Sequence, residues 1–197
     1  MGSFVFRKKL LLLHRIFFKK QTNVRWVRDK SKFFWKMKLL NLPSCPVRLT
    51  EKDGKTTIYD PFRRKNVMLT PEEWVRHHFV QFLITARSFP PERIANEVSI
   101  TVNATSKRCD TVVYDHFLNP IVVIEYKAPE VAVTPAVFDQ IARYNFALRV
   151  PYLMVSNGMT HYCCRMDYTT MQCHFLDDIP DYKWILEKSR YLCGLLI

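Results

Sequence analysis

The run "PIVVIEYK" at residues 120–127 constrains the fold of this chain more than any other stretch. Its consecutive apolar and β-branched residues are typical of a strand buried in the middle of a sheet. The same run nevertheless ends with Glu125 and Lys127, residue types that are almost never buried without a partner. Because an unpaired buried charge is costly, we expect a partner or a ligand close to this end of the strand.

Local signals predict an α/β fold with a mixed central sheet flanked by helices. A first helix follows Thr70 and Pro71, an N-cap and a first helical residue, and Glu73 would complete a capping box. A second helix follows Thr134 in the same way. Strand-like runs cover 96–103, 108–115 and 120–127 between the helices and 152–158 and 161–167 after them, and a hairpin around Asp53-Gly54 precedes them all.

The basic character of the chain lies mostly in its first residues. Residues 1–36 carry eleven Lys or Arg and one acid, a net charge of +10, which leaves +2 for residues 37–197. The aliphatic run of this leader is too short to span a bilayer. Three interpretations stay open: a basic arm for nucleic acid, a membrane-surface helix, or residues outside the natural product. We favour the last, with Met37 as the start of a single domain over 37–197.

The six cysteines show no CxxC pair, and no secretory signal precedes them. We therefore expect a reduced, cytoplasmic chain. A zinc site at Cys163 and Cys164 is disfavoured because adjacent residues of a strand point to opposite faces of the sheet.

A candidate site follows from the hairpin formed by the second and third strand runs. If Asp115 pairs with Pro120 across the loop, the same register places Asp110 directly opposite Glu125. Opposed residues share a face with their Cβ atoms about 4.5–5.5 Å apart, and Lys127, two residues on, joins them there. The site end of this hairpin would thus gather two carboxylates and an amine.

Two carboxylates so close repel each other unless a cation or a proton lies between them. Mg²⁺ suits this arrangement, because it is bound through one or two carboxylates together with substrate phosphate oxygens. Lys127 could then orient or activate a water molecule. The simpler alternative is that Lys127 forms a salt bridge with Glu125 or Asp110 and closes the end of the sheet.

The second helix adds side chains suited to nucleic acid. Gln140 and Tyr144 lie four residues apart on one helix face, and Arg143 and Arg149 flank Tyr144. An amide, a hydroxyl and guanidinium groups can all contact a phosphate backbone.

Together, "CD" at 109–110, "EYK" at 125–127 and "QIARY" at 140–144 resemble the motifs of the PD-(D/E)xK nucleases. More closely, residues 37–182 resemble the N-terminal nuclease domain of type I restriction endonuclease R subunits, in small stand-alone bacterial versions. The resemblance implies a restriction-endonuclease-like core and hydrolysis of phosphodiester bonds in DNA with Mg²⁺ or Mn²⁺.

The resemblance also implies roles for individual residues. Asp110 and Glu125 would hold the metal with the backbone carbonyl of Tyr126, and Glu97 would be a further acid nearby. Lys127 would act on water, while Gln140, Arg143 and Tyr144 would position DNA. The implied partners are DNA and a helicase or other restriction-system subunit, with a homodimer left open and no role for a membrane. The alternative function is a DNA-binding accessory module that keeps the fold but has no cleavage of its own. Because residues 37–197 are nearly neutral, tight DNA binding by the domain alone is weakened, and a partner would have to supply further DNA contacts.

Overall fold

The structure is a computed structural model that describes residues 38–102 and 105–193. Its centre is a sheet of six strands in the order β4-β5-β6-β7-β8-β9. The neighbours β6 and β7 are parallel and the other neighbours are antiparallel, so the sheet is mixed, as expected. The strands are Ile94–Val102 (β4), Thr105–Tyr114 (β5), Pro120–Tyr126 (β6), Tyr152–Ser156 (β7), His161–Asp167 (β8) and Gln172–Phe175 (β9).

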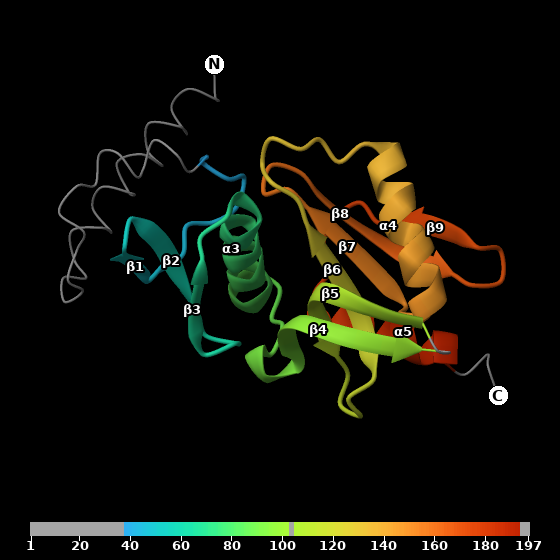
Figure 1. The fold of residues 1–197 in the computed structure, drawn as a ribbon. Helices are drawn as coiled ribbons and strands as arrows, with labels where there is room; N and C mark the ends of the chain where they lie inside the picture. Colours follow the sequence, from blue (N-terminus) through green and yellow to red (C-terminus); the bar gives the residue numbers. More distant parts are fainter. Residues whose placement is uncertain (1–37, 103–104, 194–197) are drawn as a thin grey trace, which may run out of the picture.

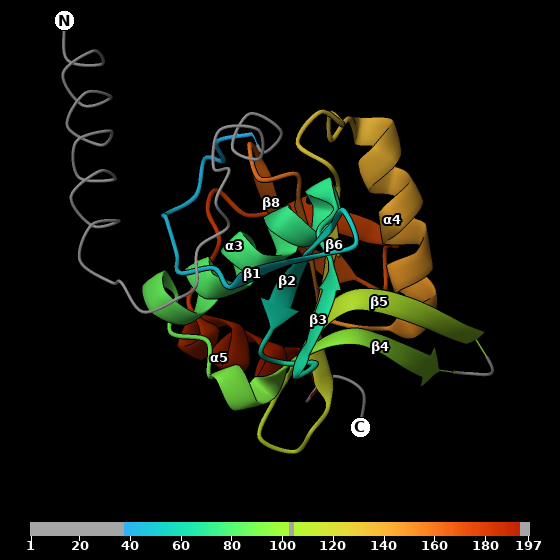
Figure 2. The same ribbon diagram turned by 60° about the vertical axis from the view of Figure 1, so that its left-hand side comes forward.

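Helices cover both faces of this sheet, as Figures 1 and 2 show. Helices α3 (Pro71–Ala86) and α5 (Tyr182–Cys193) pack on one face, and α4 (Pro135–Leu148) packs on the other. A short 3₁₀ helix, η1 (Pro91–Arg93), leads into β4. The expected α/β architecture, with a mixed central sheet flanked by helices, is confirmed.

Both predicted helix starts are confirmed by their caps. The hydroxyl of Thr70 accepts a hydrogen bond from the backbone N–H of Glu73 at 3.1 Å, and Thr134 does the same for Val137 at 3.4 Å. The carboxylate of Glu73, however, does not complete a capping box. It accepts hydrogen bonds from the guanidinium groups of Arg63 and Arg76 instead.

The two faces of the sheet support separate apolar clusters. Strand β7 is buried along its whole length, and its residues alternate between the clusters. Neighbouring Cys163 and Cys164 on β8 follow the same alternation, since Cys163 packs on the α3 side and Cys164 on the α4 side. Burial raises the thiol pKa of both residues. These two cysteines are therefore packing residues that cannot face one metal ion.

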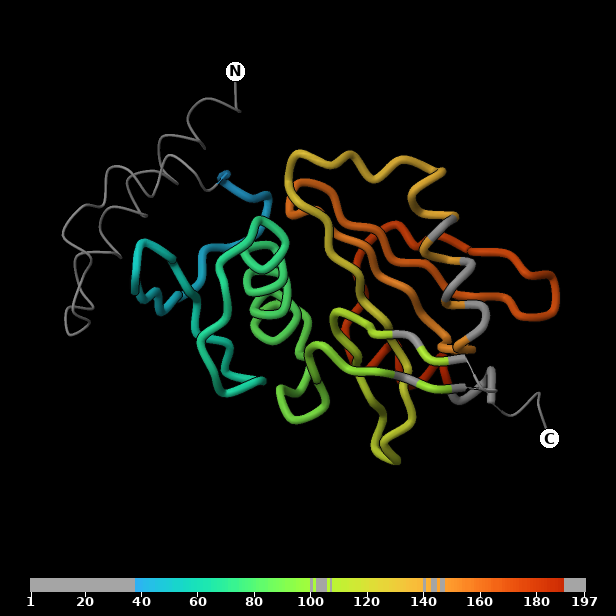
Figure 3. Tube along the Cα trace, viewed as in Figure 1, coloured from blue at the N-terminus to red at the C-terminus, as the bar shows by residue number. Residues whose placement is uncertain are grey.

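A smaller sheet, in the order β1-β2-β3, lies beside α3 (Figure 1). It contains the predicted hairpin, because Asp53 and Gly54 both have positive φ and join β1 (Leu49–Lys52) to β2 (Lys55–Asp60). Its third strand, β3 (Lys65–Met68), and the edge strand β9 were not predicted. Figure 3 follows the chain from β3 through α3 into β4, so α3 connects the two sheets.

One predicted strand pair is wrong. Pro120 pairs with Tyr114, not with Asp115, because the register shifts between Val113 and Tyr114. The carboxylate of Asp115 instead accepts hydrogen bonds within the loop that joins β5 to β6. Beyond the shift the strands return to the expected register, in which Thr111 pairs with Ile124.

The expectations for residues 1–36 lie outside the described part of the chain. Among the described helices, none is long and apolar enough to cross a membrane.

Candidate active site at the diverging ends of β5 and β6

The paired residues of β5 and β6 end at Thr111 and Ile124, one position before Asp110 and Glu125. Beyond that pair, the Asp110 side chain substitutes for the strand backbone. Its Oδ2 accepts a hydrogen bond of 2.9 Å from the backbone N–H of Tyr126, which belongs to the peptide bond that follows Glu125. The carboxylate of Asp110 thus lies against the end of β6, next to Glu125, the residue that the sequence places opposite it.

Glu97 on β4 lies across from Asp110 on β5, because the pairs Asn96–Thr111 and Val98–Cys109 flank this position. Asn96 and Thr111 form a hydrogen-bond chain with Tyr126 on the α3 side, whereas Val98 and Cys109 pack on the α4 side. The regular alternation of side chains between the two faces of the sheet is therefore interrupted at Glu97 on β4 and at Asp110 on β5.

The backbone accommodates this change through Glu97, whose φ is +57°. A non-glycine residue in the left-handed region costs energy of order 1 kcal/mol or more, and such residues concentrate at functional sites. The result is that two carboxylates from neighbouring strands, Glu97 and Asp110, both reach the same helix α3.

Arg76 of α3 connects these carboxylates. Its guanidinium group is buried, lies 2.7 Å from Oε1 of Glu97 and 3.0 Å from Oε2 of Glu73, and approaches Oδ1 of Asp110 at 3.5 Å. It also lies 5.7 Å from the centre of the Tyr126 ring, a favourable position for a cation over an aromatic face. Arg76 thus fixes the end of β6 and the acids of β4 and β5 relative to α3.

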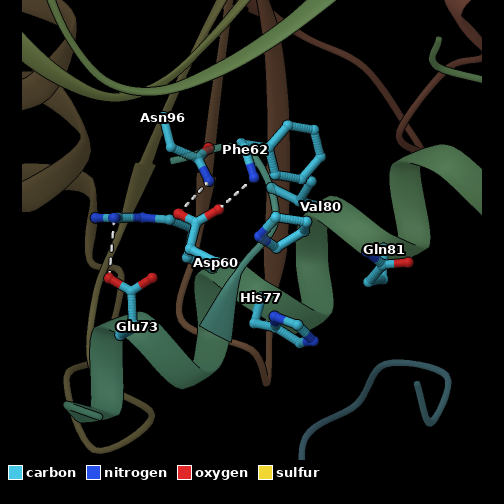
Figure 4. Close-up of a pocket in the computed structure, with 9 residues that line it drawn as sticks. Asp60, Phe62, Glu73, His77, Val80, Gln81 and Asn96 are labelled. Carbon is cyan, nitrogen blue, oxygen red and sulfur yellow. Dashed lines mark hydrogen bonds and ion pairs between the residues drawn. The ribbon is translucent and has the colours of Figure 1, made fainter. Parts of the chain in front are cut away.

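A second arginine extends the network to the small sheet. Arg63 forms ion pairs with Asp60 and Glu73, and Asp60 also accepts a hydrogen bond of 3.1 Å from the side-chain amide of Asn96. Figure 4 shows Asn96 and the backbone N–H of Phe62 pointing at the Asp60 carboxylate, in a pocket that Glu73 and His77 also line. These contacts join the small sheet, α3 and β4.

The arginines favour the ionised form of two of these acids, Glu97 and Asp60. Burial raises the pKa of Glu97, but the opposing effect of Arg76 and Arg108 is larger, so the pKa of Glu97 falls below its usual range. Burial likewise opposes ionisation of Asp60, while hydrogen bonds from Asn96 and Arg63 bring the Asp60 pKa below its usual value. Both side chains are therefore carboxylates at neutral pH.

Asp110 is the acid in this group with the weakest ionic contact. Its side chain is 28% exposed, and its one ion-pair distance, 3.5 Å to Arg76, is longer than those that Glu97 makes with Arg76 and Arg108. The network contains four carboxylates, on Asp60, Glu73, Glu97 and Asp110, and three arginines, Arg63, Arg76 and Arg108. The residual negative charge is therefore concentrated toward the accessible Asp110.

The donor atoms at this position are compatible with a hard cation. Asp110, half-buried Glu125 and the carbonyl of Tyr126 offer oxygen ligands, the class that Mg²⁺ prefers. Within residues 38–102 and 105–193, no three His, Cys, Asp or Glu side chains gather closely enough to hold a metal by themselves. A Mg²⁺ site usually has one or two protein carboxylates and takes further ligands from water and substrate.

Lys127 lies just past the end of β6. Its backbone N–H donates a hydrogen bond of 3.0 Å to the carbonyl of Ser156 on the parallel neighbour β7, which fixes the backbone at this residue. Its side chain is half-buried. The backbone of α4 contains Gln140, Arg143 and Tyr144, whose side chains are outside the described part of the chain.

Sequence reasoning did not find the arginine network. Glu73 and Arg76 are three residues apart on α3, a spacing that allows an ion pair, but the pattern does not indicate that Arg76 also meets Glu97 and Asp110. Asp60 and Arg63 have the same separation in the sequence and are joined in the structure. A search for acid–arginine pairs at this spacing would have detected both.

Comparison with known proteins assigns a family. Residues 71–180 match the model of a family described as "Type I restriction enzyme R protein N terminus", which is more than half of the chain. The chain belongs to this family. The resemblance of residues 37–182 to the N-terminal domain of type I restriction endonuclease R subunits is confirmed at the level of the family.

Two solved structures are also similar. One is a fragment from Vibrio vulnificus, described as an HsdR subunit of a type I restriction enzyme, with 20% identity and a TM-score of 0.46 over 64% of this chain and 26% of that one. The other, from Anabaena variabilis, is described as a nuclease of the DUF820 group, with 11% identity and a TM-score of 0.40 over 70% of this chain and 88% of that one. This chain thus spans about a quarter of the Vibrio fragment. Among curated proteins, no relative matches the chain.

Proposed function

We propose that this protein is a metal-dependent nuclease that hydrolyses phosphodiester bonds in DNA. The observation that carries the proposal is the position of Asp110, whose Oδ2 is hydrogen-bonded to the peptide that links Glu125 to Tyr126. This contact joins the Asp of β5 to the Glu-x-Lys segment of β6. Membership of the R-protein N-terminus family supports the same function.

Asp110, Glu125 and the carbonyl of Tyr126 would hold Mg²⁺ or Mn²⁺. The metal would supply Lewis-acid stabilisation of the phosphate and a lowered pKa of a bound water. Glu97 is less suited to be a ligand, because Arg76 engages its Oε1 and Arg108 its Oε2. In this proposal the role of Glu97 is to hold the two arginines.

Lys127 would orient the attacking water and stabilise negative charge as the phosphorus–oxygen bond breaks. The hydrogen bond between the Lys127 backbone N–H and the Ser156 carbonyl fixes the backbone from which the side chain extends, two residues beyond Glu125. Proton transfer and charge stabilisation by a positioned side chain contribute roughly 10²–10⁴-fold to a rate. Gln140, Arg143 and Tyr144 of α4 would position the DNA.

The test is a nuclease assay of the full chain on supercoiled, linear and single-stranded DNA with Mg²⁺ or Mn²⁺. We expect cleavage that stops when EDTA removes the metal. The variant Lys127→Gln should cleave about 10²–10⁴-fold more slowly while its melting temperature and DNA affinity change little. Cleavage that persists in EDTA, or an unaffected Lys127→Gln variant, would contradict the proposal.

A second candidate function is a DNA-binding module that depends on another subunit for productive cleavage. The dependence on another subunit is supported by the net charge of only +2 over residues 37–197, because tight binding to phosphates requires an excess of Lys and Arg that a partner would have to supply. In that case the full chain alone would bind DNA weakly without cutting it. Adding a helicase or another restriction-system subunit would then produce cleavage, and Lys127→Gln should slow that cleavage about 10²–10⁴-fold.

A further inference from the structure

Arg108 has an unusual combination of exposure and order. Its side chain is 71% exposed, yet its Nη2 lies 2.5 Å from Oε2 of Glu97, a carboxylate that is itself only 19% exposed. Glu97 is in turn held at 2.7 Å by Arg76, which is buried on α3. The ion pair with Glu97 therefore orients the guanidinium of Arg108, while most of the Arg108 side chain faces solvent.

Arg108 also lies close to the candidate metal ligand along the same strand. It is two residues before Asp110, a separation of about 7 Å in an extended chain. The intervening Cys109 packs on the α4 side, and Arg108 reaches Glu97 on the opposite, α3 side, where Arg76 approaches Asp110. Arg108 and Asp110 thus border the same part of the surface.

Arg108 presents the outermost positive charge of the network. Arg76 is buried and is paired with Glu73, Glu97 and Asp110, whereas Arg108 is paired with Glu97 and has most of its side chain exposed. The exposed part of the Arg108 guanidinium is therefore available to an anion. A guanidinium fixed in advance loses less entropy when it binds a phosphate, and its planar set of donors matches phosphate oxygens.

We propose that Arg108 is a phosphate-binding residue for the DNA strand bound at Asp110, and that Glu97 is its positioning residue. This inference rests on the proposed function and adds to it a specific contact outside the Asp110, Glu125 and Lys127 group. The contact is with the phosphate backbone, so it contributes affinity and orientation and carries no preference for base sequence.

A purely structural role is the competing explanation. Glu97 and Arg108 are diagonal neighbours across the β4–β5 hairpin, and oppositely charged cross-strand pairs stabilise sheets modestly. A structural pair would change the melting temperature when it is removed. It would leave the salt dependence of DNA binding unchanged, because that dependence reports the number of phosphates neutralised.

The experiment measures binding of the full chain to a fluorescent DNA duplex by anisotropy, in EDTA to prevent cleavage, between 50 and 200 mM salt. For Arg108→Gln we expect weaker binding and a slope of log K against log[salt] that is reduced by about 0.9, the value for one lost phosphate contact. Arg108→Lys should keep the wild-type slope. Arg64→Gln is the matched control, because Arg64 is an exposed arginine in the loop between β2 and β3 and should leave the slope unchanged.

Glu97→Gln tests the positioning role. It keeps the positive charge of Arg108, so we expect the wild-type salt slope with lower affinity. A wild-type slope in Arg108→Gln, with or without a lower melting temperature, would overturn the inference and leave the proposed function intact. A wild-type protein that does not bind DNA at 50 mM salt would overturn both, so the two failures are distinguishable.

Discussion

Strand β5 has an aspartate near each end of its pairing with β6, and the two aspartates have different environments. Asp115, at the loop end, accepts hydrogen bonds from the backbone N–H groups of Phe117 and Asn119, both at 2.8 Å, and from the Asn119 side chain at 3.1 Å. Asp110, at the diverging end, accepts one backbone hydrogen bond and has one long contact to Arg76. The first carboxylate is satisfied by its own loop, whereas the second retains acceptor capacity.

The two acids differ in where their hydrogen-bond partners come from. Donors within four residues of Asp115 close a loop and occupy both carboxylate oxygens. The donors to Asp110 come from β6 and α3, elements that are distant in the sequence, and they orient the carboxylate without saturating it. An acid held in this way is suited to bind a metal or a substrate.

The largest expected difference between the two aspartates is in DNA cleavage. Asp110→Asn keeps the size of the side chain but removes the charge that would bind the metal, so we expect the cleavage rate to fall by roughly 10²-fold or more. Asp115→Asn is the matched control and should cleave at close to the wild-type rate. The measurement is the initial rate of plasmid cleavage in Mg²⁺ or Mn²⁺. Equal rates in the two variants would remove the distinction between the two ends of β5.

The next largest effect is expected at Arg76, the buried arginine that contacts Asp110 at the diverging end of β5. Arg76→Met removes the cation shared by Glu73, Glu97 and Asp110 and leaves these acids without their buried partner. Breaking a buried ionic network of this kind typically costs about 3–5 kcal/mol in the free energy of unfolding. Urea unfolding measures this loss, and Arg64→Met, at an exposed arginine, should change stability by no more than about 0.5 kcal/mol. A loss below about 1 kcal/mol for Arg76→Met would show that the network does not stabilise the fold.

Much of the fold could be predicted from the sequence because its determinants are local. The caps at Thr70 and Thr134 and the turn at Asp53-Gly54 depend on a few adjacent residues, and each is present in the structure. Strands β3 and β9 were missed because each is a four-residue edge strand whose existence depends on its neighbour. Their local pattern is too short to distinguish from a loop.

The candidate site was predictable only in part. The pairing of Thr111 with Ile124 supports the register that brought Asp110 to Glu125, although the assumed Asp115–Pro120 pair was wrong. The shift lies next to Asp115, whose side chain accepts hydrogen bonds that close the loop, and strand patterns do not contain these contacts. The contacts of Arg76 depend on how α3 crosses β4 and β5, which is a property of tertiary packing.

Acid should weaken the fold through α3, the helix that supplies Arg76 to the site end. His78 donates a hydrogen bond from Nδ1 to the carbonyl of Trp74, and burial, aided by the nearby His77, lowers the pKa of His78 from 6.5 to about 4. The unfolded chain therefore binds a proton near pH 6.5 that the folded chain excludes until about pH 4. The contribution of neutral His78 to the free energy of unfolding is fully present above pH 6.5. It is lost as the pH falls toward 4, and the loss is at most about 3 kcal/mol.

Urea unfolding between pH 7 and pH 4 measures this dependence. In His78→Asn the amide can replace the Nδ1–H donor but does not titrate, so the decline in unfolding free energy should be smaller by about 3 kcal/mol. His77, whose pKa burial also lowers, remains in both proteins, so its own burial affects both pH profiles. Parallel pH profiles for the wild type and His78→Asn would show that His78 is not kept neutral by the fold.

The smallest expected effect is at the loop end. Asp115→Ala removes the acceptor for the backbone N–H groups of Phe117 and Asn119, but this loop is exposed and water can replace the lost bonds. We expect a loss of about 1–2 kcal/mol in the free energy of unfolding and no change in DNA cleavage.

Asn119→Ala provides the second arm of a double-mutant cycle, because the Asn119 side chain donates to Asp115 Oδ2 at 3.1 Å. A coupling energy of about 0.5 kcal/mol or more between the two positions would confirm that Asp115 acts on its own loop. If Asp115→Ala instead reduced cleavage without reducing stability, the loop end would be part of the catalytic machinery and the contrast with Asp110 would fail.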